Sequence, residues 1–279
     1  MMNILRADIY RIIRGKGLYI SLAVLIVVIA MSSLSGGTMG VSYGGMVVLD
    51  ETMEAIGNDT TEQLAAERSA AFRAPTGAEA LAKSASSSNN VLFFMLPLVI
   101  FVSIVDFSSG GAKNTLAGGV NRAKFYFSKL LLSFFLCALF LLIYVLLSIL
   151  LASVFNGFGG SFDGAFVMLV VKILLTQLWL CLAGVCVANF FAFLFRSPAF
   201  VGVYIAFLLL PPLLIFALTF INEWFSKLFD YELTMNIGLM ANMGALSAGE
   251  VIRVMLIGAG YIAAAGVGGL AIFKRAEIK

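Results

Sequence analysis

The segment DFSSGGAKNTLAGGVNRAKFYFSK, residues 106–129, lies between two long apolar runs at 91–105 and 125–155. Both runs are apolar enough to lie in lipid, whereas the segment is polar, rich in glycine and basic. It is long enough for one short helix with a turn at each end. Its basic residues are Lys113, Arg122, Lys124 and Lys129. Because basic residues concentrate on the cytoplasmic side of membrane proteins, we expect this segment in the cytoplasm.

The composition of the chain predicts an integral membrane protein. Of its 279 residues, 61% are hydrophobic and only 12% are charged, against about 25% charged residues in ordinary soluble domains. The three cysteines, Cys137, Cys181 and Cys186, lie inside apolar runs and are expected to be buried thiols rather than disulfides or metal ligands. The net charge of +3 is small, so no nucleic-acid partner is expected.

Apolar segments long enough to cross a bilayer recur along the chain. A helix needs about 20 mostly apolar residues for this. The predicted spans are 17–35, 90–109, 126–155, 164–195, 198–221 and 250–273. The first has no clear cleavage site after it, so we expect a retained span rather than a signal peptide. The sequence thus predicts an all-α membrane protein, one transmembrane domain over residues 1–279 with six spans.

Charge asymmetry predicts the orientation of these spans. Both ends of the chain and residues 106–129 are mainly basic, whereas 36–89 and 222–249 hold most of the acidic residues. The positive-inside rule then places both termini in the cytoplasm. Residues 36–89 are expected to form an extracellular loop with some helix, either an outer gate or a passive loop.

Two further segments have patterns of their own. Residues 222–249 are too apolar for a free loop and too interrupted for a span, so re-entrant or interfacial short helices are expected there. In the last span, small residues recur at four-residue spacing, which predicts close helix packing in lipid. These residues are Gly260, Ala264 and Gly268.

Residues 1–16 are expected to form an amphipathic helix on the inner leaflet. Apolar side chains fall on one helical face, while Arg6, Arg11 and Arg14 face elsewhere. The alternative is a plain positive flank without fixed contacts. Both interpretations keep this segment at the inner membrane surface.

The residue order within 106–129 resembles one family. An acidic residue, a glycine-rich turn, Lys-Asn-x-Leu-x-x-Gly and Asn-Arg-x-x-x-Tyr-x-x-Lys are similar to the segment between the second and third spans of ABC type-2 permeases. These are the membrane subunits of ATP-driven exporters, in which the segment is a coupling helix that touches a separate ATPase. The other interpretation is a solvated loop whose charges only fix topology.

The resemblance implies roles for individual residues. Lys113, Asn114, Thr115 and Leu116 would form the docking helix, and Arg122 and Lys124 would contact acidic groups on the ATPase or lipid phosphates. Asp106 stands where family members often carry Glu. Turns at the helix ends would come from Gly110, Gly111, Gly118 and Gly119. Many members have Gly-Thr where this chain has Gly110-Gly111, so a capping hydroxyl is missing. The N-terminal helix would be the elbow helix that packs near the ATPase.

The chain lacks residues on which several classes of enzyme depend. It contains no histidine, and its Gly15-Lys16 pair is followed by glycine, so it has no P-loop. We therefore expect no enzyme and no cofactor in this chain, with ATP and Mg on a partner ATPase. Polar groups within the spans are few: Asp106, Lys172, Gln177 and Asn189. All except Asp106 are expected to be satisfied structurally, which argues against a proton relay.

The resulting functional prediction is the transmembrane subunit of a bacterial ABC exporter in the cell membrane. Two copies are expected to form the pathway in the lipid bilayer with two ATPase subunits, as a homodimer or with a relative as a heterodimer. The cargo expected is an amphipathic or hydrophobic substrate, above all an antimicrobial or cytolytic peptide. The alternatives are a drug, lipid or sodium exporter of the same family and a non-transporting immunity or receptor protein.

Overall fold

The computed structural model describes residues 2–35, 74–241 and 246–276, and within these ranges every regular element is a helix. The all-α class predicted from the sequence is therefore confirmed for this part of the chain. The elements in order are α1 Met2–Arg14, α2 Lys16–Ser35, α5 Gly77–Ser86, α6 Asn89–Val99, η1 Ile100–Ile104, α7 Val105–Ser108, α8 Gly111–Ala117, α9 Arg122–Asn156, α10 Gly164–Phe195, α11 Phe200–Thr219, η2 Glu223–Tyr231, α12 Leu233–Leu239 and α13 Ala248–Arg275.

Five helical segments are long and apolar enough to cross a membrane. They are Asn89–Ser108, which combines α6, η1 and α7, and the helices α9, α10, α11 and α13. A sixth crossing is obtained if the bent pair Leu5–Arg14 and Lys16–Ser32 counts as one span; the two helices meet at 62°. A multi-pass membrane protein follows from these lengths and compositions.

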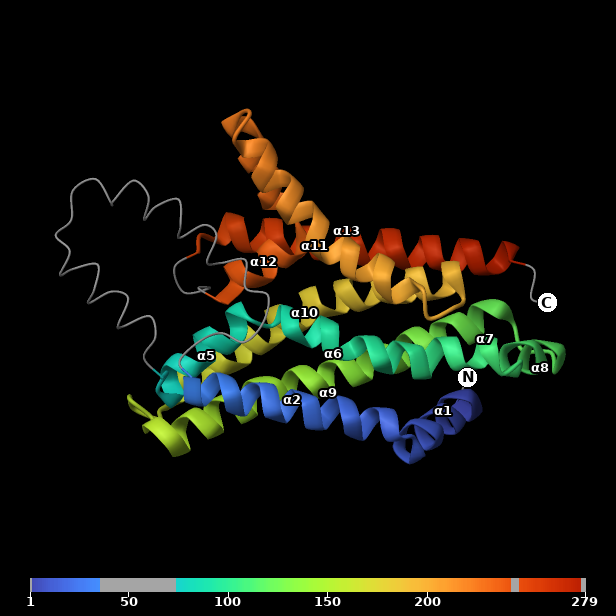
Figure 1. The fold of residues 1–279 in the computed structure, drawn as a ribbon, viewed down its shortest axis with the longest axis horizontal. Coiled ribbons are helices and arrows are strands. Elements are labelled where there is room, and N and C mark those ends of the chain that lie inside the picture. Colours follow the sequence, from blue (N-terminus) through green and yellow to red (C-terminus); the bar gives the residue numbers. More distant parts are fainter. Residues whose placement is uncertain (1, 36–73, 242–245, 277–279) are drawn as a thin grey trace.

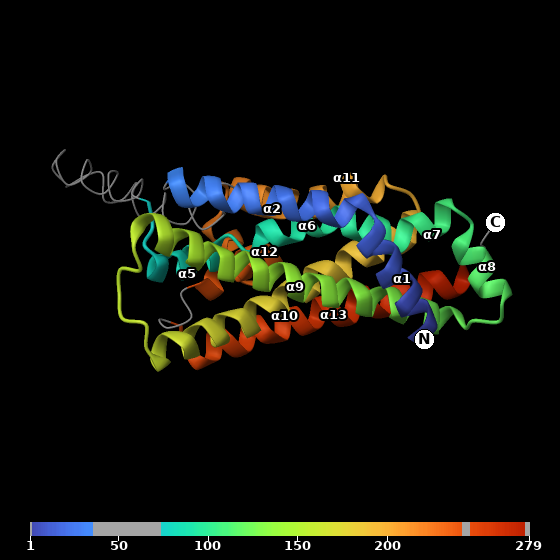
Figure 2. The ribbon, with the colours of Figure 1, turned by 90° about the horizontal axis from the view of Figure 1, so that it is seen from below.

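The long helices lie side by side in a bundle, with α10 inside it (Figures 1 and 2). Helix α10 packs most extensively along α13 and also contacts α9, α11 and α6. Helix α11 leans out of the bundle in Figure 1 and is the least buried of the five long segments. Pro211 and Pro212 both lie inside this one helix.

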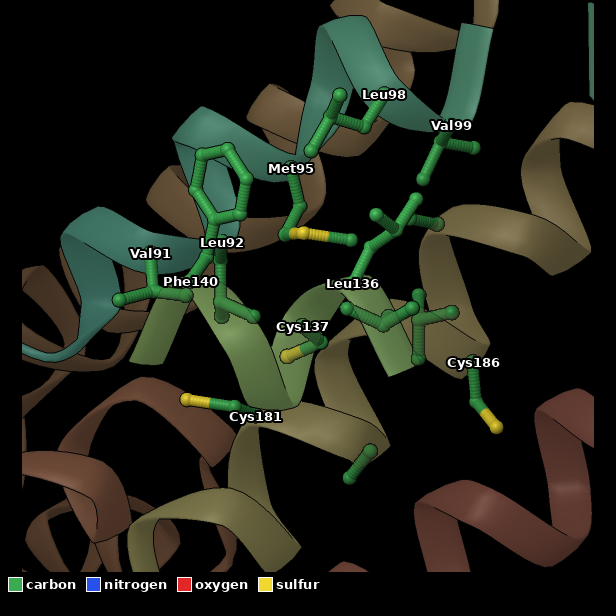
Figure 3. Packing of buried hydrophobic residues seen from close by; sticks show 14 of the residues in the cluster. Val91, Leu92, Met95, Leu98, Val99, Leu136, Cys137, Phe140, Cys181 and Cys186 are labelled. Atoms are coloured by element: carbon green, nitrogen blue, oxygen red, sulfur yellow. The ribbon is translucent and has the colours of Figure 1, made fainter. Parts of the chain in front are cut away.

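The core is formed where α6, α9 and α10 meet (Figure 3). Leu92 and Met95 of α6 lie beside Phe140 of α9, and all three side chains are at most 1% exposed. Gly184 of α10 permits this approach, because an added Cβ would lie 2.7 Å from a methyl group of Leu92. The three cysteines are buried free thiols, as the sequence predicted.

The end of the predicted 36–89 loop is helical and buried. Helix α5 begins with a capping box between Thr76 and Glu79, and it packs against α9. Leu81 and Ala85 are at most 2% exposed. The sequence predicted some helix within 36–89, and the structure places one here because an Ala-rich amphipathic helix has an apolar face that the bundle buries. Residues 36–73 lie outside the described residues.

Two short helices occupy residues 223–239, in the stretch where short helices were expected. Helix α12 is buried: Leu233 and Ile237 are fully shielded. Buried amides hold it, because Asn89 Nδ2 donates to Thr234 O at 3.2 Å and Gln177 Nε2 donates to Ile237 O at 2.9 Å. The bundle, rather than an open surface, therefore surrounds α12.

Only one of the small residues predicted to pack in α13 lies close to a neighbouring helix. Gly260 has open space around it and Ala264 is exposed, whereas an added Cβ on Gly268 would lie 3.2 Å from the Phe190 ring of α10. The buried small residues are Gly258, Ala265 and Gly269. A Cβ on Gly258 would lie 2.7 Å from Trp179 Nε1, which donates to Met255 O at 3.0 Å. Four-residue spacing identifies one helical face but does not tell which face meets a neighbour.

We expect Gly258→Ala to lower the stability of the folded chain by about 1–3 kcal/mol, because its methyl group would overlap the Trp179 ring. Thermal unfolding in a mild detergent measures this. Gly260→Ala is the matched control and should leave the melting temperature unchanged or slightly higher, since Ala favours helix. Equal melting temperatures for the two variants would contradict this packing.

Candidate functional site

One end of the bundle gathers segments that are far apart in the sequence. Helices α1, α7 and α8, the first turn of α9 and the last turn of α13 all lie there (Figures 1 and 2). The hydrogen bonds agree with this placement, since Arg122 at the start of α9 reaches Phe273 near the end of α13. This is the end that carries residues 106–129. We call it the basic end.

A four-residue ionic cluster lies inside the basic end. Helix α1 contributes Asp8 and Arg11, α7 contributes Asp106, and α9 contributes Lys129. Lys129 Nζ lies 2.6 Å from Asp8 Oδ2 and also pairs with Asp106. Arg11 Nη2 lies 3.0 Å from Asp8 Oδ1, and Arg11 Nη1 pairs with Asp106. Two cations and two carboxylates thus alternate around a closed ring that joins three helices.

The cluster is buried, and its pairing offsets the cost of burial. Lys129 is 0% exposed, Asp8 is 5% exposed and Asp106 is 7% exposed. An unpaired charge in such a place costs several kcal/mol, so each member depends on the others. Burial raises the pKa of the Asp8 carboxyl above its ordinary value, and the Lys129 ammonium opposes that rise. With both carboxylates ionised, the formal charge of the ring is zero.

Arg11 also ties the cluster to an irregular part of the second long helical segment. Its Nη2 donates to Phe101 O at 2.9 Å, inside the π-helical stretch η1. Pro97, just before this stretch, lacks an N–H, so the helical ladder is already interrupted there. A change from α to π bonding leaves a carbonyl that needs another donor, and the guanidinium supplies one. The helix after Pro97 thus contains a π segment that is hydrogen-bonded to α1.

Helix α8 lies directly against the cluster. Gly110 precedes it with φ 73°, and Gly119 follows it with φ 85°, so glycine is required at both turns. Gly111 lies inside the helix and Gly118 has a negative φ. Of the four glycines predicted to form the turns, only Gly110 and Gly119 therefore need the conformational freedom of glycine. An added Cβ on Gly111 would lie 3.4 Å from Asp106 Oδ1. The first turn of α8 therefore abuts the Asp106 carboxylate.

The two faces of α8 differ in exposure. Ala112 is buried, while Thr115 and Leu116 are half-buried. Thr115 Oγ1 donates to Gly111 O at 2.8 Å within the helix. Lys113 and Asn114 are exposed. Of the four predicted docking residues, these two are therefore the most available to a partner. No side chain caps the helix start, which agrees with the absence of a hydroxyl at residues 110–111.

Arg122 makes hydrogen bonds within the chain. Its Nη1 donates to the carbonyl oxygens of Phe273, Lys274 and Ala276 at 3.2, 2.9 and 2.6 Å. It thereby satisfies carbonyls at the C-terminal end of α13, where the helix dipole favours a cation. The expected contact of Arg122 with an ATPase or lipid phosphates stays a prediction. Lys124 remains exposed.

The three arginines of α1 also differ in exposure. Arg6 and Arg14 are exposed, and Arg14 lies over the Tyr10 ring at 4.8 Å. Arg11 instead turns inward to the cluster, so it is not one of the free surface cations that the sequence predicted. Ile12 is buried, whereas Ile13 remains 52% exposed. One face of α1 therefore packs on the bundle and another stays apolar and exposed, as an interfacial helix requires.

An open cleft of about 400 Å³ lies beside the cluster. The ring residues, Gly111 and Thr115 of α8, and Phe125 of α9 line it. The cleft thus separates part of α1 from α8 and α9. Space at this point allows α8 to shift against the ring without first displacing packed side chains.

Asp8 and Lys129, which belong to the ionic cluster, were not identified as site residues from the sequence. Both were counted only as surface charges of the basic side. One signal was available for each: Asp8 is the single acid in a basic helix, and Lys129 is followed by an unbroken leucine run. A charge at the edge of a span is retained when a partner compensates it. Asp106, by contrast, was singled out from the sequence, and the structure pairs it with Arg11 and Lys129.

Gln177 and Asn189, two of the other polar groups within the long helices, make buried hydrogen bonds, as expected. Asn189 Oδ1 accepts from Ser103 Oγ at 3.2 Å and from Ser133 Oγ at 3.4 Å, and it bridges helices. Lys172 is exposed on α10. No cluster of three His, Cys, Asp or Glu side chains that could hold a metal occurs in the described part of the chain.

No protein-family model matches the sequence, and no curated protein matches it. The functional argument therefore depends on the residues of this chain and on their geometry.

We expect Lys129→Met to lower stability by about 3–5 kcal/mol, because two buried carboxylates would then share Arg11 as their cation. Thermal unfolding in detergent measures the loss. The double variant Asp8→Asn/Lys129→Met restores the charge balance and should recover part of it.

Lys124→Met is the matched control, since Lys124 is exposed five residues earlier on the same helix. It should change stability by no more than about 0.5 kcal/mol. If Lys129→Met were equally mild, the ring would not be a stabilising centre of the basic end.

Proposed function

We propose that this chain is the transmembrane subunit of an ATP-driven exporter of the ABC type-2 permease class. The observation that carries the proposal is the position of α8, whose exposed Lys113 and Asn114 face outward while its first turn abuts a buried ionic ring. The match of residues 106–129 to the coupling segment of that family supports the same assignment.

In this proposal the basic end is cytoplasmic and the chain has six spans, with α2 as the first. The exposed α1 arginines and the basic end of α13 would lie at the inner leaflet, as the positive-inside rule requires. ATP and Mg would be bound by a separate ATPase, because this chain has no P-loop. The membrane would be the bacterial cytoplasmic membrane.

The geometry offers a direct route from α8 to the spans. A push on α8 displaces Gly111 against Asp106, whose carboxylate is held by Arg11 and Lys129. Because Arg11 also binds Phe101 O, the same displacement reaches the π segment of the second span. Ionic rings and irregular helix are elements with alternative arrangements, which is what a coupling device needs. The ring would therefore convert movement of α8 into movement of α1, the second span and α9 together.

Two copies of the chain are proposed to form one conduit, with a homodimer favoured over a heterodimer. The exposed apolar face of α11 leaves room for a second copy or for lipid. The proposed cargo is amphipathic or hydrophobic, with antimicrobial or cytolytic peptides first. Drugs, lipids and sodium remain alternative cargoes for the same architecture. The sparse ionisable groups within the long helices support an apolar cargo.

A pull-down from native membranes in mild detergent tests the proposal. We expect a stoichiometric P-loop ATPase to copurify with the chain and to be lost, together with ATPase activity, in Lys113→Glu. The charge reversal would repel acidic groups on the partner and should leave the melting temperature unchanged, because Lys113 is exposed.

Lys274→Glu is the matched control, an exposed lysine at the same end of the bundle but on α13. It should retain the ATPase. Recovery of the chain alone, from a preparation that keeps other transporters intact, would refute the permease assignment and favour a non-transporting immunity or receptor protein.

A further inference from the structure

Helix α1 lies at the edge of the bundle, and its outer face combines cations with apolar side chains (Figure 1). Arg6, Tyr10 and Arg14 follow one another at four-residue spacing, so they lie along one side of the helix, and all three are exposed. Ile9 and Ile13 fall beside this row and are also exposed. The ring residues of α1 lie on another side of the helix, against the bundle. The coupling role described above therefore assigns no partner to this outer face.

The positive charge of this face is not neutralised within the described part of the chain. Asp8 is the only acidic residue in α1 and α2, and it is buried in the ionic ring. No ion pair joins Arg6 or Arg14 to a carboxylate among the described residues. Arg14 lies over the Tyr10 ring, which holds its side chain along the helix but leaves its charge in place. The outer face of α1 therefore attracts anions.

An exposed apolar stripe on α2 begins at a further cation. Lys16 is the first residue of α2, and Ile20, Val24 and Val27 follow it at spacings of four, four and three residues. These spacings place all four on one side of the helix. The three apolar members are 61%, 47% and 60% exposed, and Lys16 is exposed as well. One side of α2 thus presents a cation at its end and then a row of apolar side chains running into the bilayer.

The corner between α1 and α2 brings the two surfaces together. The helices meet at 62°, and only Gly15 separates Arg14 from Lys16. An anion at this corner would meet several cations, and a hydrocarbon chain attached to it could follow the stripe on α2. A free anion or an acidic protein surface would satisfy the cations but would leave that stripe uncovered. A phospholipid has both parts in one molecule, and basic residues beside a membrane span favour lipids with a net negative charge.

We propose that the outer face of α1 and the stripe on α2 bind an anionic phospholipid, with Arg6, Arg14 and Lys16 around its headgroup and one acyl chain along Ile20, Val24 and Val27. The lipid would hold α1 from outside while the ionic ring holds it from inside. This inference needs only a membrane protein. It does not require the export role, so it can hold or fail independently of the permease assignment.

Lipid competition on the purified full-length chain in dodecyl maltoside tests the proposal, because this detergent is uncharged. Dioleoylphosphatidylglycerol and dioleoylphosphatidylcholine have the same acyl chains and differ in net charge. With equal amounts of the two lipids, native mass spectrometry should find the glycerol lipid bound about tenfold or more in excess. The same lipid alone should raise the melting temperature more than the choline lipid does. Glycerol 3-phosphate, at the concentration of the lipid, should not displace it.

Variants locate the site. Arg6→Gln/Arg14→Gln should reduce the preference for the anionic lipid by about tenfold, whereas Arg6→Lys/Arg14→Lys should keep it, since both retain or remove charge at the same positions. Lys16→Gln should reduce the preference to a smaller extent. The matched control is Lys172→Gln/Lys227→Gln, which removes two exposed cations from α10 and η2 and should leave the preference unchanged. All these side chains are exposed, so the variants should fold.

Several outcomes would overturn the proposal. Equal binding of the two lipids, or an equal loss of preference in the control variant, would show that this corner does not select anionic lipid. Displacement of the lipid by an equal concentration of glycerol 3-phosphate would indicate a phosphate site without a role for the stripe. If Arg6→Gln/Arg14→Gln kept the lipid preference but lost a protein in the pull-down, the face would belong to an acidic protein surface instead.

Discussion

Charges buried at one end of an apolar bundle must neutralise one another, and this constraint organises the basic end of the molecule. Asp8, Arg11, Asp106 and Lys129 alternate in sign, and each contacts two members of opposite charge. Removing one member leaves a buried charge whose solvation nothing else supplies. The positions of α1, α7 and α9 relative to one another are therefore coupled. Helix α8, which begins against Asp106, rests on that coupled unit.

A second constraint comes from the backbone. Pro97 removes a donor from the second long helical segment, and a π segment follows within one turn. The irregular stretch binds Arg11, so the interruption and the ionic ring stabilise each other. A regular helix at this place would offer no carbonyl to the guanidinium. The local irregularity is thus part of the same arrangement as the buried charges.

Close helix packing makes the rest of the bundle rigid by comparison. Gly184 lets α6 approach α10, and Gly258 lets the Trp179 ring lie against α13. The short helices α5 and α12 fill the opposite end, and buried amides hold α12. Movement of the basic end would therefore be transmitted through long helices rather than absorbed along them.

The lengths and apolarity of the segments were enough to predict an all-helical membrane protein with one short helix within residues 106–129. Such features depend on local composition and on hydrophobic periodicity, which a sequence displays directly. Asp106 was also singled out among the polar groups within the spans. Some helix was predicted within 36–89, although its place was not given, and the Thr76–Glu79 capping box of α5 is visible in the sequence.

Only the tertiary structure decided which charges meet. In the sequence, Arg11 lies 95 positions from Asp106 and Lys129 lies 23 positions from it. No local sequence pattern joins residues that far apart. The same holds for Arg122, whose carbonyl partners are at the far end of the chain, and for Gly258, whose neighbour belongs to another helix. Helical spacing assigns residues to a face, but the neighbour that covers this face is set by how the whole bundle packs. The sequence by itself therefore determined the helical elements and their apolar medium, and the packing decided the ionic ring and the cap on α13.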